Sequence, residues 1–329
     1  MALKDSLYER SHDSGSNSVC SKAFKDTSTV VYFVGYVIFF VLSLLVIAVQ
    51  FYLRKRYNNQ TTRKLLGLLY TAAIVCVSIS WLLQIIGTLV TQCNLRNSHR
   101  YFTTFYNLTI ANSVIANLGA FLTLAAVVWG VNSMLSEHLG RKNKSASHRT
   151  SSMVIIIGMC MLTIVLIIMQ CVFYSSLVAA IRGAALGWFP YGFHIFLMLY
   201  SVVWIVNVLV GLGLAIHTLR ALKSELGVSI TRPLIWIIFA FSALAFSVLL
   251  EIVPLTNAFE DNEPVNEPGR QAVFFLATLS QIFSFVAVAM LAINAPWNDS
   301  SGDNSGENGG RYQPMGDYGV DLSNPYQRK

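Results

Sequence analysis

The chain has 329 residues, of which 54% are hydrophobic and only 12% are charged. A soluble domain usually carries about a quarter charged residues, so a water-soluble globular fold is excluded. The formal net charge of +7 does not indicate nucleic-acid binding, because the basic residues lie in short loops beside long apolar stretches. In that position they are expected to face anionic lipid headgroups.

Seven apolar stretches follow one another along the chain, and each is long enough to cross the hydrocarbon core, which takes about 20 residues. Every backbone amide in lipid needs an internal partner, so all seven are predicted to be helices. The stretches are 29–53, 65–90, 107–133, 153–181, 192–219, 233–255 and 272–294. They predict an all-α integral membrane protein with a seven-transmembrane helix bundle. The polar segment 1–28 precedes the bundle, and a tail over 295–329, rich in Gly, Asn, Asp and Ser, is predicted to be disordered.

The basic residues are distributed unevenly between the two sets of loops. Twelve lie in the loops 54–64, 134–152 and 220–232, and four lie in the loops 91–106, 182–191 and 256–271. Cytoplasmic loops carry the excess of Lys and Arg. This bias predicts an N-terminus outside the cell or in a lumen and a C-terminus in the cytoplasm, and we expect the plasma membrane rather than an internal one.

The third stretch carries the clearest stripe of small and polar residues at helical spacing: Asn112, Ala116, Gly119, Thr123, Ala126 and Gly130. In lipid, helices associate through small residues that allow close approach and through hydrogen bonds between helices. The stripe therefore predicts that this helix is a central and tightly packed member of the bundle.

Glu251 is the only acidic residue inside a predicted span, and an ionisable group at membrane depth is commonly functional because its burial is costly. It shares a helical face with Ala243 and Ser247, which predicts that it points into the bundle. Its role is either a ligand or cation contact or an ion pair, with Arg182 and Arg270 as candidate partners. The candidate ligand-binding residues are Glu251, His194, Gln84, Asn112, Asn117, Asn207 and Gln281. Alternatively, the amide side chains only hold the helices together.

The sequence offers no motif for metal binding or catalysis. His194 and His217 lie at opposite ends of the fifth stretch, so we predict no metal site, no cofactor and no enzyme. Cys20 and Cys93 both fall on the predicted outer side and are candidates for a disulfide, with two unpaired thiols as the alternative.

Seven helices with an outside N-terminus resemble the organisation of G-protein-coupled receptors, in topology only. The third stretch ends Trp129-Gly-Val-Asn-Ser-Met134, without the acidic-arginine-aromatic triplet of the rhodopsin-like class, and Asn324-Pro-Tyr326 lies in the tail rather than in the seventh stretch. The topology implies a receptor-like or sensor protein with an outward-facing ligand or partner surface. A cytoplasmic signalling or sorting partner would meet its inner loops and tail. A small-solute transporter, and a scaffold or trafficking protein without a small-molecule ligand, remain as alternatives.

Overall fold

A computed structural model describes residues 24–57, 60–92, 99–139, 144–181, 189–226, 230–257 and 267–294. By the contacts within it, the chain divides into two compact units, Met1–Asn298 and Asp299–Lys329. Every described residue lies in the first unit. Among the described residues, seven helices are long and apolar enough to cross a membrane. They confirm the prediction of an all-α, multi-pass membrane protein.

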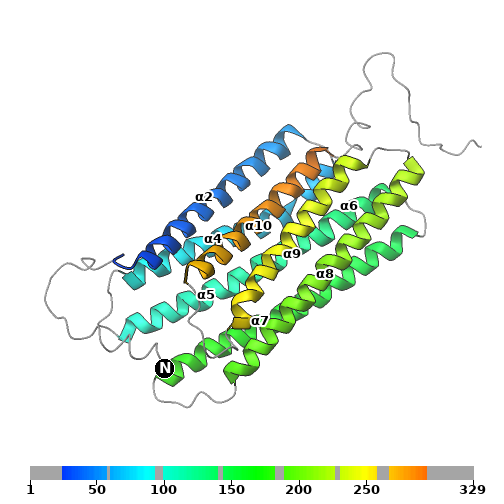
Figure 1. Cartoon of the computed structure of the whole chain (residues 1–329). Coiled ribbons are helices and arrows are strands. Elements are labelled where there is room, and N and C mark those ends of the chain that lie inside the picture. Colours follow the sequence, from blue (N-terminus) through cyan, green and yellow to red (C-terminus); the bar gives the residue numbers. More distant parts are fainter. Residues whose placement is uncertain are drawn as a thin grey trace, which may run out of the picture. The chain divides into compact units, whose positions relative to one another are not determined.

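The helices run nearly the whole length of the described chain (Figure 1). They are α2 (Thr27–Arg56), α3 (Gln60–Leu65), α4 (Leu68–Gln92), α5 (His99–Leu124), the π-helical segment η2 (Ala125–Trp129), α6 (Gly130–His138), α7 (Lys144–Ile181), α8 (Phe189–Leu226), α9 (Thr231–Asn257) and α10 (Glu267–Asn294). The segments α5, η2 and α6 follow one another without a break and form the third span. Most ends lie beyond the predicted stretches, because the apolar count marks the hydrocarbon core while helical hydrogen bonding continues into the headgroup region.

The spans pack in chain order. Each of the helices α2, α4, α5, α7, α8, α9 and α10 packs against the next, and α10 packs back against α2, so the seven form a closed ring. Arg54, Lys55 and Arg56 end α2, and Arg63 and Lys64 lie in α3, at what we call the basic end of the bundle. The opposite end, where α2 and α10 begin, is called the Glu267 end.

The start of α2 is joined to α10 and α4. The Asp26 carboxylate caps α2 by accepting from the backbone N–H groups of Ser28 and Thr29, each at 3.3 Å. The Ser28 hydroxyl donates to Glu267 over 2.8 Å. Aromatic rings continue this contact toward the core, since Phe274 lies edge-on to both Tyr36 and Trp81 with centroids within 6 Å.

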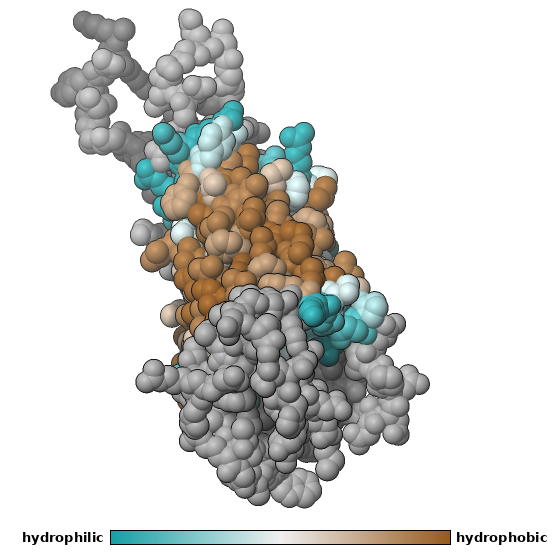
Figure 2. Space-filling model, turned by 90° about the vertical axis from the view of Figure 1, so that its left-hand side faces the viewer, coloured by the Kyte–Doolittle hydropathy of each residue, from teal (hydrophilic) through white to brown (hydrophobic). Residues whose placement is uncertain are grey.

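Large apolar side chains cover the outer surface of the ring. On α8, Val202, Val206 and Leu209 are each more than half exposed. Figure 2 shows a broad apolar band across the face in view, with hydrophilic side chains at both ends of it. An exposed apolar area of this extent is unfavourable in water and is the expected solvent-facing surface of a protein in hydrocarbon.

Candidate functional site

Glu251 lies on the inward face of α9 and is nevertheless exposed. Leu244 and Ser247 are buried, and at about 100° per residue Glu251 is rotated by only about 20° and 40° from them around the helix. The exposed Phe246 and Leu249 on the lipid face are about 140° or more away. Glu251 itself is exposed although it lies deep among protein atoms. An accessible side chain on an inward face indicates a space inside the bundle.

The third span explains this space, because its two halves pack differently. Between Phe105 and Leu122 only Gly119 is buried, whereas every residue from Thr123 to Val128 is buried. In the first half, α5 packs on α4 and α7 and makes no more than isolated contacts with α8, α9 and α10. In the second half, η2 contacts α8 and α9, and α6 contacts α8. The third span therefore fills the centre of the ring near the basic end, whereas toward the Glu267 end it is only half-buried and makes no more than isolated contacts with α8, α9 and α10.

From the exposure of Glu251 and the few contacts of α5 we infer a space between α5, α7, α8 and α9 in the Glu267 half, which we call the central crevice. Beside the crevice, two pairs of hydrogen-bonding residues connect α5 to the neighbouring helices. Ser80 of α4 donates to the Oδ1 atom of Asn112 over 2.9 Å. The Nδ2 atom of Asn117 donates to the Oε1 atom of Gln170 on α7 and to the carbonyl of Ser113. The two asparagines predicted from the sequence thus join α5 to α4 and α7.

The polar contacts continue from α7 to Glu251. The hydroxyl groups of Thr163 on α7 and Tyr200 on α8 are 3.0 Å apart, and the Glu251 carboxylate is close enough to the Tyr200 hydroxyl to interact with it electrostatically. Tyr174 of α7 adds a long contact of 3.5 Å from the Ser113 hydroxyl. Polar groups from four neighbouring helices therefore gather in the Glu267 half of the bundle.

His194 lies near the start of α8 among aromatic rings. Its imidazole is 6.3 Å from the ring of Phe173 on α7, and Phe173 stacks on Phe193 with centroids 4.8 Å apart. His194 is half-buried. It occupies the same helical face as the buried Ser201, about 20° away around the axis, so it is directed inward like Glu251.

The remaining predicted amides are less engaged. Gln84 on α4, Asn207 on α8 and Gln281 on α10 are half-buried. Among the described residues, these three side chains form no hydrogen bond, so they lie in the bundle without being joined to Glu251.

Of the two arginines and two cysteines named as candidates, the structure describes only Arg270. Arg270 is exposed in the first turn of α10 and interacts with Tyr32 of α2. Within the ranges that the structure describes, no ion pair joins Arg270 to Glu251. Arg182, Cys20 and Cys93 lie outside the described residues, so the ion pair with Arg182 and the disulfide stay predictions.

The basic half of the bundle is closed by close packing on η2. A Cβ atom added to Gly211 of α8 would lie 2.8 Å from the Cγ1 atom of Val128 and 3.1 Å from the ring of Phe241. Asn132, one turn beyond, donates to the carbonyls of Val128 and Gly211 over 2.8 and 3.1 Å. π-helical segments are rare, and those that do occur are often found at functional sites. This one forms the floor of the central crevice.

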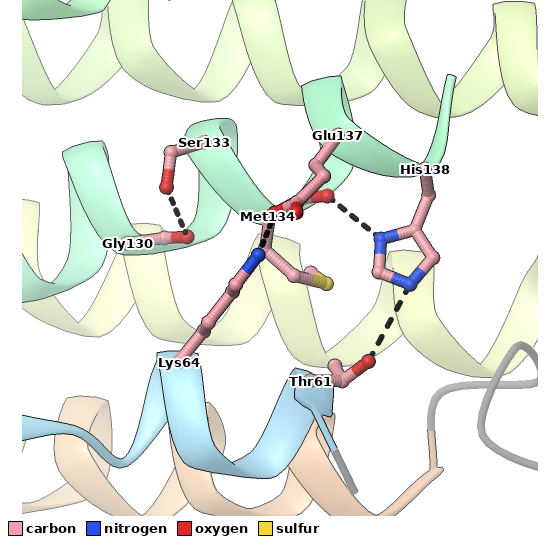
Figure 3. A network of polar contacts seen from close by, with 7 residues as sticks. All are labelled: Thr61, Lys64, Gly130, Ser133, Met134, Glu137 and His138. Atoms are coloured by element: carbon pink, nitrogen blue, oxygen red, sulfur yellow. Dashed lines mark hydrogen bonds and ion pairs between the residues drawn. The ribbon is translucent and has the colours of Figure 1, made fainter. Parts of the chain in front are cut away.

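A second set of contacts connects α3 to α6 at the basic end (Figure 3). Lys64 pairs with Glu137, and the Thr61 hydroxyl lies 3.4 Å from the Nε2 atom of His138. The His138 Nδ1 atom is 2.8 Å from the carbonyl oxygen of Met134, which can only accept, so Nδ1 carries the hydrogen. These contacts hold the short helix α3 against the end of the third span.

Several polar residues of the Glu267 half were not singled out as site residues by the sequence. Thr163, Gln170 and Ser80 were detectable, because each is a hydrogen-bonding residue inside an apolar span. Tyr174 and Tyr200 carry no such signal, since tyrosine is common near membrane interfaces without a role in a site. Gln50 was also missed. It is fully buried in α2 and donates to the Leu66 carbonyl over 2.9 Å, at the break between α3 and α4.

No group of three or more His, Cys, Asp or Glu side chains suited to a metal ion occurs among the described residues. Comparison with protein-family models, with curated proteins and with solved structures found no match to this chain. The central crevice is therefore the feature of this chain that bears on its function.

Proposed function

We propose that the protein is a receptor-like or sensor seven-helix protein whose ligand enters the central crevice from the Glu267 end. The observation that carries this proposal is Glu251, an accessible carboxylate on the inward face of α9. Sites between the helices of a bundle commonly combine an apolar wall with a few polar groups that orient the ligand. Asn117, Tyr200 and His194 are the polar groups that we assign to this role.

The proposal includes an orientation. The basic end is assigned to the cytoplasm because Lys and Arg are concentrated in its loops and helix ends. The crevice then opens to the outside, and we assign the protein to the plasma membrane. The contacts between α3 and α6 lie at the end that a cytoplasmic signalling partner would meet.

A transporter is the second candidate, favoured by one observation. The crevice is open in one half of the bundle and closed in the other by η2, the arrangement that alternating access requires of one of its two states. A receptor needs ligand-dependent change at the basic end without net passage of solute, and a transporter needs passage.

The test is proximity labelling from a ligase fused to the C-terminus of the full chain in cells. Enrichment of heterotrimeric G-protein subunits, reduced by Asn117→Leu in the crevice, is the expected result. Enrichment of coat adaptors alone would replace the proposal by a trafficking role, and solute uptake by proteoliposomes containing the full chain would replace it by transport. The matched control is Leu118→Ala, beside Asn117 on an exposed face of α5.

A further inference from the structure

We propose that the ligand of the central crevice is a small organic cation, with the Glu251 carboxylate as its counter-ion. This inference rests on the proposed function, because it assigns a chemical class to the ligand of the same crevice.

Charge balance in the crevice favours a cation. Glu251 is accessible but deep within the bundle, and among the described residues no Lys or Arg side chain pairs with it. A carboxylate held away from bulk water is costly unless a positive charge accompanies it. A bound cation supplies that charge, whereas an anionic ligand would add a second negative charge at the same depth.

The polar groups of the crevice also suit a cation. Tyr200 interacts electrostatically with Glu251 and is bonded to Thr163, and Asn112 and Gln170 lie on α5 and α7. All four are neutral, and each has an oxygen that accepts hydrogen bonds from an ammonium group. A tyrosine ring also attracts a cation through its π face.

An organic cation fits this set better than a divalent metal ion. Ca²⁺ takes 6–8 oxygen ligands, usually with several carboxylates. Within the described chain, no three acidic, His or Cys side chains gather in one place. A single carboxylate with phenol and amide neighbours is instead the donor set that an ammonium group needs.

The experiment measures the charge preference of the crevice through a reporter thiol at position 248. Val248 is half-buried and one turn before Glu251 on α9, so a cysteine there lies about 5–6 Å from the carboxylate-bearing residue. The full chain carrying Val248→Cys, in nanodiscs, is treated with a trimethylammonium or a sulfonate methanethiosulfonate. Modification at position 248 is followed by mass spectrometry, and each rate is divided by the rate of the same reagent with a free thiol.

A single negative charge at about 6 Å in a water-like medium changes each rate about threefold, in opposite directions for the two reagents. The expected preference for the cation is therefore about tenfold. It should fall to about one with Glu251→Gln, and with Glu251→Met if the glutamine variant does not fold. Because the thiolate fraction of the reporter enters both rates equally, the ratio reports the charge around the reporter.

The outcomes separate this inference from the proposed function. A ratio near one with Glu251 intact, or a tenfold ratio that survives both neutral variants, overturns the cation proposal and leaves the crevice in place. If a cysteine at 248 reacts no faster than one at Leu249, which is exposed on the lipid face, water does not reach the inward face of α9. The crevice and the proposed function would then both be wrong.

Discussion

Substitution of Gly211 by alanine tests the closed half of the bundle most directly. The new Cβ atom would lie 2.8 Å from a methyl carbon of Val128 and 3.1 Å from the ring of Phe241, and both residues are fully buried. Neither has free space to move into, because η2 packs against α8 and α9 on that side. The backbone of α8 must therefore move away from η2, and the Asn132 bond to the Gly211 carbonyl lengthens.

Overpacking of a filled core costs about 1–3 kcal/mol. Alanine also favours a helix over glycine by about 1 kcal/mol, so the measurement needs a control that has the second effect alone. Gly213 is that control, since it lies two residues further along α8 and an added Cβ meets nothing within 4 Å. The difference between Gly211→Ala and Gly213→Ala then isolates the overpacking.

The assay is thermal unfolding of both variants in the same nanodisc preparation. At about 2–4 °C per kcal/mol for a chain of this order of size, Gly211→Ala should unfold roughly 2–12 °C below Gly213→Ala. Equal midpoints, or a higher midpoint for Gly211→Ala, would refute the close approach of α8 and η2. In that case η2 does not close the basic half.

Three further outcomes follow from the same structure. Gln50→Leu should lower stability by about 1–3 kcal/mol in denaturant or thermal unfolding, because it leaves the Leu66 carbonyl buried without its amide donor. The control Gln84→Leu removes no side-chain hydrogen bond and should change stability less. Lys64→Ala should change stability by less than about 1 kcal/mol, since the ion pair with Glu137 is exposed, and a loss above about 2 kcal/mol would contradict this. An epitope tag at the N-terminus should bind antibody on intact cells, whereas a tag at the C-terminus should need permeabilisation; the reverse pattern would invert the proposed orientation.

The sequence predicted the number and order of the spans because one strong physical constraint determines both. Lipid requires about 20 apolar residues for each crossing and a fully hydrogen-bonded backbone. The break between α3 and α4 was not predicted, since 60–67 contains no proline and Gly67 alone is a weak signal. The π-helical segment at Ala125–Trp129 was not predicted either, because one extra residue in a turn leaves the apolar pattern almost unchanged.

The candidate site was predicted in part. The face of Glu251 was readable, because Ala243 and Ser247 mark the inward side of α9 by helical spacing. The partner of Asn117 was not readable, because helical spacing within one chain segment does not specify which residue of another helix lies opposite. The pairing with Gln170 depends on the rotation and depth of α7 against α5, and both are set by the packing of the complete bundle.

The stripe of the third span shows why one helix can be both tightly packed and beside an open space. Its small residues permit close approach only where a neighbour presents backbone or a short side chain. Gly119 meets such a surface at Cys76 and Val77 of α4, where an added Cβ atom would lie 3.3–3.4 Å away. Toward the Glu267 end the stripe changes to Asn112, which accepts a hydrogen bond from Ser80 of the same neighbour, α4. The stripe thus holds α5 against α4 at both depths, by close approach at Gly119 and by a hydrogen bond at Asn112, while α5 makes no more than isolated contacts with α8 and α9.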